Sequence, residues 1–149
     1  DTSQMFTIGK TSILAERLSR VAQECLYIAI NLVKPGARLG DIGAAIQKHA
    51  ELHNYSVVRE YCGHGIGKVF HEDPQVLHYG RPGTGMTIQA GMIFTIEPMI
   101  NAGKARCKID RKDGWTARTI DSRLSAQFEH TILITENGCE ALTDVYGDF

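Results

Sequence analysis

The sequence predicts an α+β domain, with two helices followed by an antiparallel sheet. Two amphipathic helical patterns come first, and short β-branched and aromatic stretches separated by glycine occupy the rest of the chain. Helices and strands that are segregated along the sequence favour the α+β class. With 149 residues, 43% of them hydrophobic, the chain is expected to form a single domain over residues 1–149.

The first helix is predicted from Ser12 to Val33, with Ser12 as its N-cap and Pro35-Gly36 as its stop signal. Its apolar residues recur at intervals of three and four, the spacing of one helix face: Leu14, Leu18, Val21, Cys25, Ile28 and Leu32. A second helix is predicted from about Asp41 to Asn54, with Asp41 as its candidate N-cap and an apolar stripe of its own.

The strands are predicted where β-branched and aromatic residues cluster. These stretches are Ser56–Glu60, Met92–Glu97, Ala105–Ile109, Thr116–Thr119 and Ser125–Thr135. Turn signals lie between them, at Arg81-Pro82-Gly83, Asp113-Gly114 and Asn137-Gly138. The first residues, from Asp1 to Gly9, alternate in the manner of a further strand.

The charge balance gives no reason to expect a polyanionic partner. Sixteen basic and seventeen acidic residues leave a formal charge of -1, so neither nucleic acid nor an anionic membrane surface is predicted to bind. The four cysteines form no CxxC pair and are expected to be free thiols in the cytoplasm. Because translation starts with Met and this chain starts with Asp1, we expect that residues precede it in the natural protein.

Four segments place an ionisable residue where a lone charge would be costly. His64 lies among the alternating glycines of Gly63–Gly67, and Glu97 ends an apolar strand directly before a proline. Glu129 lies inside a β-branched strand, and Asp1 opens the chain. Taken singly, His64 is equally well explained as a hydrogen-bonded histidine in a turn, and Glu97 is better explained as a solvated strand end.

Together, one histidine and three carboxylates form a hard, mostly oxygen-donor set. Such a set suits Mn, Fe, Co or Zn in a hydrolytic site. Within the last predicted strand, period two places Glu129 on the same face as Gln127 and Thr131, with Phe128 and His130 on the other.

Six ordered motifs carry a resemblance to a known family. They are Asp-Thr-Ser-x-Met-Phe, Glu-Tyr-Cys-Gly-His-Gly-Ile-Gly, Phe-His-Glu-x-Pro, Phe-Thr-Ile-Glu-Pro-Met, Lys-Asp-Gly-Trp-Thr and Ser-Ala-Gln-Phe-Glu-His-Thr. From Asp1 to about Leu142 the chain resembles the carboxyl-terminal half of the type I, bacterial-type, methionine aminopeptidases. The resemblance implies half of a pita-bread fold, with two helices packed on a curved antiparallel sheet.

The resemblance also implies roles for individual residues. The metal ligands would be Asp1, His64, Glu97 and Glu129. Glu97 would also act as general base, and His71 would hydrogen-bond the scissile carbonyl group. Phe70, His71 and Trp115 would contact the substrate. These ligands complete one site for Co, Mn, Fe or Zn, whereas the family's second site needs an aspartate upstream of Asp1 that this sequence does not contain.

The expected activity is metal-dependent removal of the N-terminal methionine from peptides and nascent chains. Alternatives are a truncated, non-catalytic module that binds a metal or a peptide, a fragment produced by cleavage, and another pita-bread peptidase of the aminopeptidase P or prolidase type. Because the family's sheet crosses between its halves, this half alone would expose an unpaired strand edge. We therefore expect a homodimer or association with an amino-terminal fragment.

Overall fold

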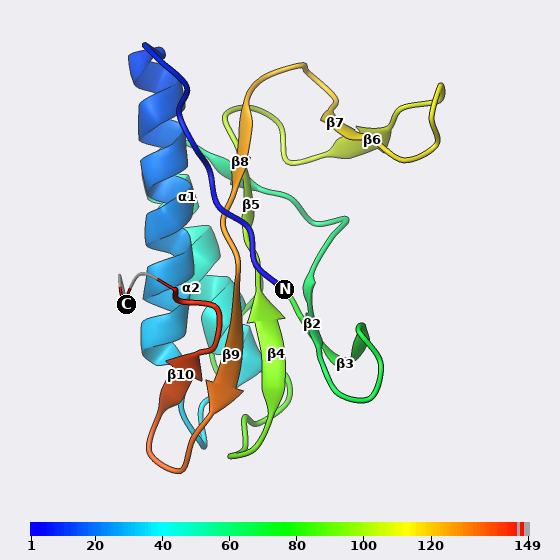
Figure 1. Cartoon of the computed structure of the whole chain (residues 1–149). Helices are drawn as coiled ribbons and strands as arrows, with labels where there is room; N and C mark the ends of the chain where they lie inside the picture. Colours follow the sequence, from blue (N-terminus) through cyan, green and yellow to red (C-terminus); the bar gives the residue numbers. More distant parts are fainter. Residues whose placement is uncertain (146, 148–149) are drawn as a thin grey trace.

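The computed structural model describes residues 1–145 and 147, and it has the predicted order of helices before strands (Figure 1). The helices are α1 (Ile13–Leu32) and α2 (Leu39–Leu52). The strands are β1 (Ser56–Val57), β2 (Gly63–Gly65), β3 (Glu72–Val76), β4 (Ile93–Ile96), β5 (Met99–Asn101), β6 (Cys107–Ile109), β7 (Ala117–Thr119), β8 (Ser125–Gln127), β9 (His130–Ile134) and β10 (Cys139–Ala141).

The helix boundaries follow from their caps. Ser12 is the N-cap of α1, as predicted, and its Oγ accepts a hydrogen bond from the Ala15 N–H at 3.2 Å. The prediction of Asp41 as N-cap of α2 was wrong, because α2 starts at Leu39 and its N-cap is Arg38. Asp41 occupies the third helical position, and its carboxylate accepts the Arg38 N–H at 2.9 Å, as in a capping box.

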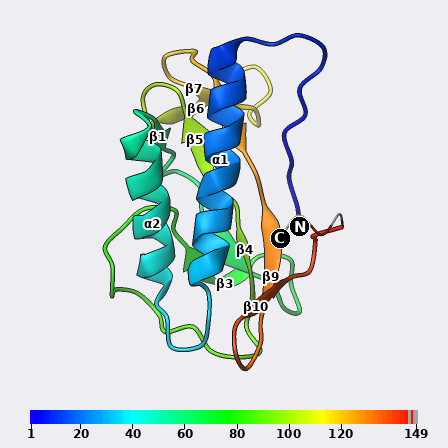
Figure 2. The ribbon, with the colours of Figure 1, turned by 90° about the vertical axis from the view of Figure 1, so that its left-hand side faces the viewer.

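All strand pairs are antiparallel within the described residues, and they form three sheets. The largest has the order β10-β9-β4-β2-β3, the second β1-β5-β8, and the third is the hairpin β6-β7. Both helices cover one side of the strands, and the hairpin projects from one end of the molecule (Figures 1 and 2). No helix among the described residues is long and apolar enough to cross a membrane.

The core lies between the helices and the sheets. Its fully buried side chains include Leu18, Leu26, Ile30, Ile42, Ile46, Phe94, Ile96, Ile100 and Ile132. Removing this apolar surface from water stabilises the fold and fixes β4 and β9 against the helices. The opposite side of these strands is therefore available for polar groups.

The structure changes several predicted strands. The five predicted stretches contain strands, but the one from Ser125 to Thr135 is divided into β8 and β9. The first nine residues form no strand and make only an isolated bridge between Ser3 and Glu129. Four strands were not predicted, namely β2, β3, β5 and β10. The four cysteines are free thiols, as expected.

Candidate metal centre

The β4–β9 and β5–β8 ladders share one register. Pairing advances without a slip from Ile93 opposite Leu133 in the β4–β9 ladder to Asn101 opposite Ser125 in the β5–β8 ladder. The ladder is interrupted only at Glu97-Pro98 and at the facing Phe128-Glu129, and Pro98 has no N–H to donate there. The shared register therefore places Glu97 directly across from Glu129.

These two facing carboxylates are largely shielded from water. Glu129 is buried, and its Oε1 has no hydrogen-bond partner within the described part of the chain. Burial, reinforced by the nearby charge of Glu97, raises the pKa of Glu129 to about 7. Burial also raises the pKa of Glu97, although the Thr95 hydroxyl and His64 oppose that shift. Two facing carboxylates with an unpartnered oxygen call for a cation.

His64 lies in the middle of β2, and its ring reaches the two carboxylates. Only glycine fits at the neighbouring positions 63 and 65. A Cβ on Gly63 would collide with the backbone oxygen of Thr95, and a Cβ on Gly65 with the backbone oxygen of Asp73. The neighbouring strands β4 and β3 thus approach β2 at a distance that excludes side chains. The glycines of β2 therefore permit a close approach of the backbone on both sides.

The His64 ring is oriented for a ligand at Nε2. Its Nδ1 lies 3.1 Å from the Gly65 carbonyl oxygen, to which it can donate, and this leaves the lone pair on Nε2. His64 Nε2 lies 3.8 Å from Asp1 Oδ2 and 3.7 Å from Glu97 Oε1, distances too long for hydrogen bonds. The side chains of His64, Asp1 and Glu97 therefore approach one another without forming hydrogen bonds between them.

Asp1 is held beside the interrupted ladder. The Glu129 N–H donates to the Ser3 carbonyl at 2.9 Å, and the Thr131 hydroxyl donates to the Asp1 carbonyl at 2.7 Å. The backbone nitrogen of Asp1 donates in turn to Thr131 Oγ1 at 2.9 Å. Figure 1 shows the N-terminal segment descending from the start of α1 and crossing the chain between β8 and β9, where the Ser3–Glu129 bridge forms.

Three supporting residues were not predicted from the sequence. Thr95 Oγ1 accepts the His64 N–H at 3.0 Å and donates to Glu97 Oε1 at 2.9 Å, so it couples β2 to the Glu97 carboxylate. Gln127 Nε2 lies 3.4 Å from Glu97 Oε2. The fully buried His78 accepts the Glu97 N–H through Nε2 at 3.1 Å, and burial lowers its pKa to about 3, which keeps this nitrogen an acceptor.

The three candidate substrate-contacting residues lie in two places. His71 stacks obliquely on His64, with ring centroids 4.1 Å apart, and Phe70 meets the His71 ring edge-on at 4.4 Å. Trp115 is 86% exposed on the β6–β7 hairpin, where it lines a shallow depression with Tyr61 and Met99. The structure brings His71 and Phe70 to His64. Trp115 lies between β6 and β7, in a hairpin that is separate from β2 and β3 (Figure 1).

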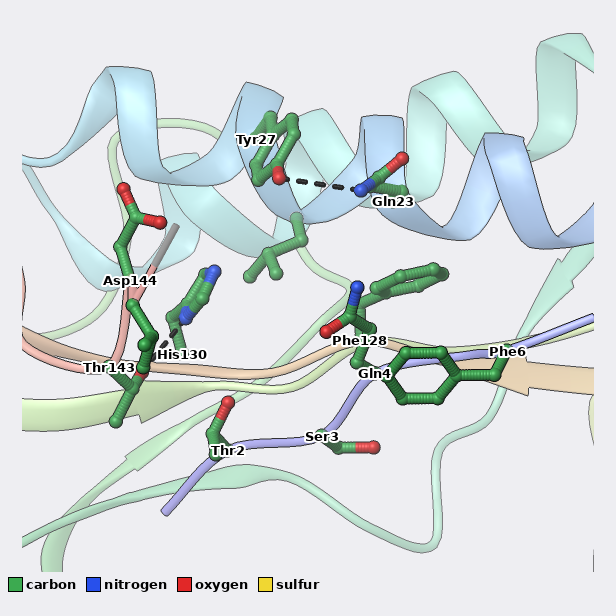
Figure 3. Close-up of a pocket in the computed structure, with 12 residues that line it drawn as sticks. Thr2, Ser3, Gln4, Phe6, Gln23, Tyr27, Phe128, His130, Thr143 and Asp144 are labelled. Carbon is green, nitrogen blue, oxygen red and sulfur yellow. Dashed lines mark hydrogen bonds between the residues drawn. The ribbon is translucent and has the colours of Figure 1, made fainter. Parts of the chain in front are cut away.

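The side of segment 127–131 that faces away from the ligand groups lines a cavity of about 340 Å³ between the N-terminal segment and α1. Phe128 and His130 line it, together with Gln23 and Tyr27 of α1 (Figure 3). Gln127 and Thr131, in contrast, bond to Glu97 and Asp1 on the ligand side. The predicted alternation of faces around Glu129 is thus confirmed.

The donor set fits a divalent cation. Ligand atoms of His64, Glu97 and Glu129 all lie within 4.8 Å of one another, and so do those of Asp1, His64 and His71. Imidazole nitrogen combined with carboxylate oxygen suits Mn, Fe, Co and Zn. Such a cation would supply the partner that Glu129 Oε1 lacks.

Comparison with known proteins agrees with this geometry. The profile of metallopeptidase family M24 matches residues 1–136. This chain belongs to metallopeptidase family M24. Methionine aminopeptidase of Salmonella typhimurium is 64% identical over 143 residues, which are 96% of this chain and 54% of that protein. The chain thus spans about half the length of the curated relatives it matches.

Solved M24 structures confirm the half pita-bread fold. The crystal structure of methionine aminopeptidase from Rickettsia prowazekii superposes with a TM-score of 0.94 at 55% identity, over 96% of this chain and 58% of that one. The prolidase from Pyrococcus furiosus superposes with a TM-score of 0.73 at 23% identity, over 95% of this chain and 36% of that one, and shows only a shared fold. Within family M24, the methionine aminopeptidases resemble this chain more closely than that prolidase does.

Proposed function

We propose that this chain takes part in metal-dependent removal of N-terminal methionine from peptides and nascent chains. The observation that carries the proposal is the register that sets Glu97 opposite Glu129, with His64 directed at the same point. The similarity to methionine aminopeptidases favours this reaction over that of a prolidase. The free thiols are compatible with a reducing compartment, and we place the activity in the cytoplasm.

The proposed ligands are Asp1, His64, Glu97 and Glu129, which would hold one Co, Mn, Fe or Zn ion per chain. When bound, the ion would supply Lewis acidity, which lowers the pKa of water and polarises a carbonyl group. Thr95 and Gln127 hold the Glu97 carboxylate in place from both of its oxygens. Hydrogen bonds from neighbouring side chains to a ligand residue fix the orientation of that ligand.

Proton transfer is assigned to Glu97, and stabilisation of the developing negative charge is assigned to His71. The raised pKa of Glu97 makes it a better proton acceptor at neutral pH than an ordinary glutamate, and it would take the proton of the attacking water. His71, stacked on His64, would donate a hydrogen bond to the carbonyl oxygen as negative charge develops. Removing such a donor costs about 3 kcal/mol of transition-state stabilisation.

Substrate contact is assigned to Phe70 and Trp115. Phe70 is 55% exposed beside His71, so its ring can cover the apolar methionine side chain next to the reacting carbonyl group. Trp115 offers a further exposed aromatic surface on the β6–β7 hairpin. Both assignments derive from the family resemblance.

Methionine release from a Met-Ala-Xaa peptide, measured with added Mn²⁺ or Co²⁺, tests the proposal. Glu97→Gln should lower kcat by about 10² to 10⁴, because it removes the proton acceptor. Glu136→Gln, which alters an exposed glutamate outside the site, should leave the rate unchanged. Metal binding without turnover in the unaltered chain would overturn the proposal and identify a non-catalytic metal-binding module.

A further inference from the structure

A second group of metal-ligating side chains lies away from the centre described above, where α1 meets α2. Glu24 belongs to α1, His49 to the last turn of α2, and His53 is the residue that caps α2. One ligand atom from each lies within 4.8 Å of the other two. The proposed reaction uses none of these three residues.

The two histidines are four residues apart, so they project from the same side of α2. Their ring centroids are 4.5 Å apart with the planes tilted by 51°. His53 Nδ1 lies 3.0 Å from the His49 carbonyl oxygen, to which it can donate, and its Nε2 then carries the lone pair. A backbone bond of this type is how ligand histidines are commonly held.

Glu24 completes the group from the neighbouring helix. Its Oε2 lies 2.8 Å from His49 Nε2, whereas its Oε1 accepts a hydrogen bond from Arg20 at 3.1 Å. The side chains of Glu24 and His49 are 35% and 19% exposed, so the group is half-buried and still open to an entering ion. The contact with Glu24 involves only His49, whereas the contact of His53 Nδ1 with the His49 carbonyl oxygen leaves His53 Nε2 for a ligand.

We propose that Glu24, His49 and His53 form a second divalent-cation site that prefers Zn²⁺ or Cu²⁺. Two imidazoles with one carboxylate favour these ions over Mn²⁺ or Mg²⁺, which select oxygen ligands. Ligand atoms about 2.1 Å from a tetrahedral ion lie about 3.4 Å apart, so Glu24 Oε2 and His49 Nε2 separate by about half an ångström on binding. The bound ion bridges α1 and α2 and stabilises their packing.

The experiment is a Zn²⁺ titration of the full chain, followed through the imidazole nitrogen signals in two-dimensional ¹H–¹⁵N NMR. The ring-nitrogen signals of His49 and His53 should shift together, and both shifts should reach saturation when the pair has bound one Zn²⁺. Glu24→Gln should weaken this binding by about tenfold or more, because it removes a ligand. Glu51→Gln, which removes a carboxylate of the same helix outside the group, should not change it.

Thermal unfolding supplies an independent measurement. Zn²⁺ should raise the Tm of the unaltered chain more than that of His49→Gln/His53→Gln, because a ligand of the folded state alone stabilises it. Unshifted His49 and His53 signals at saturating Zn²⁺ in the unaltered chain would overturn the proposal. Because that measurement needs no variant and no turnover, it is independent of the folding of mutants and of the proposed peptidase activity.

Discussion

At the scale of single residues, two threonine hydroxyls determine where the acidic ligands lie. Thr95 joins the His64 backbone to the Glu97 carboxylate, and Thr131 joins the backbone of Asp1 to β9. Each hydroxyl both donates and accepts a hydrogen bond, and replacement of the threonine by valine removes both functions. The geometry of the centre therefore depends on residues that carry no charge.

Thr95→Val is expected to weaken both the fold and the centre. The substitution leaves the buried His64 N–H without its Thr95 acceptor and removes the hydroxyl that donates to Glu97 Oε1, at a cost of about 1 to 3 kcal/mol in unfolding free energy. Thr95→Ser keeps the hydroxyl and should retain most of the stability and metal affinity. Urea unfolding and Mn²⁺ titration of both variants measure this, and equal losses in the two would contradict it.

Glu129 should make the stability of the chain depend on metal. Saturation with Mn²⁺ at about a hundred times Kd should stabilise the unaltered chain by about 2.7 kcal/mol, and a chelator should reverse the effect. Glu129→Gln removes a ligand and the repulsion with Glu97, so the metal-free variant should be no less stable than the metal-free parent. Calorimetry with and without Mn²⁺ tests this, and an undiminished metal effect in the variant would exclude Glu129 as a ligand.

Charged residues of the centre were predictable from the sequence, whereas their supports were not. Glu97, Glu129 and His64 stand out because a charge beside apolar or glycine-rich sequence needs a partner. Thr95 and His78 lie in stretches where a threonine or a histidine is ordinary. His78 gains its role only from the Glu97 N–H, and Thr95 only from the pairing of β2 with β4. That pairing joins segments about thirty residues apart, as the 31-residue separation of His64 and Thr95 shows.

At the scale of elements, β2 depends on its glycines. Gly63→Ala is expected to cost about 1 to 3 kcal/mol, because the added Cβ meets the backbone oxygen of Thr95, which cannot rotate away. Gly138→Ala is the matched control, since a Cβ there meets nothing and should change stability by no more than about 0.5 kcal/mol. The midpoints of urea unfolding decide, and similar midpoints for both variants would refute the close approach of β2 and β4.

The helices were predicted to within a few residues, and the short strands were not. A stretch of twenty residues contains several helical repeats, as in α1, whereas strands of three residues such as β2 and β10 contain too few to show a period. β3 contains Pro74 and two acidic residues, a composition that argues against a strand. β5 follows Pro98, which divides what is otherwise one ladder.

At the scale of the whole molecule, the helices cover one side of the sheets and an apolar surface remains exposed near the N-terminal segment. Phe6, Ile8, Ile13 and Leu14 are between 70% and 90% exposed, and beyond the bridge at Ser3 the segment as far as Gly9 pairs with no strand. Exposed apolar side chains beside unpaired backbone are typical of an interface. We propose that a second copy or an amino-terminal fragment covers it.

Light scattering of the chain alone, at micromolar concentration, should therefore give a mass above the 16.5 kDa of one chain. Phe6→Ser combined with Ile8→Ser removes two of the most exposed apolar side chains of the segment and should shift the chain toward the monomer. Leu52→Ser, at a residue 75% exposed at the end of α2, is the control and should leave the mass unchanged. A stable monomer of the unaltered chain would rule out self-association, and only the amino-terminal fragment would then remain as the partner.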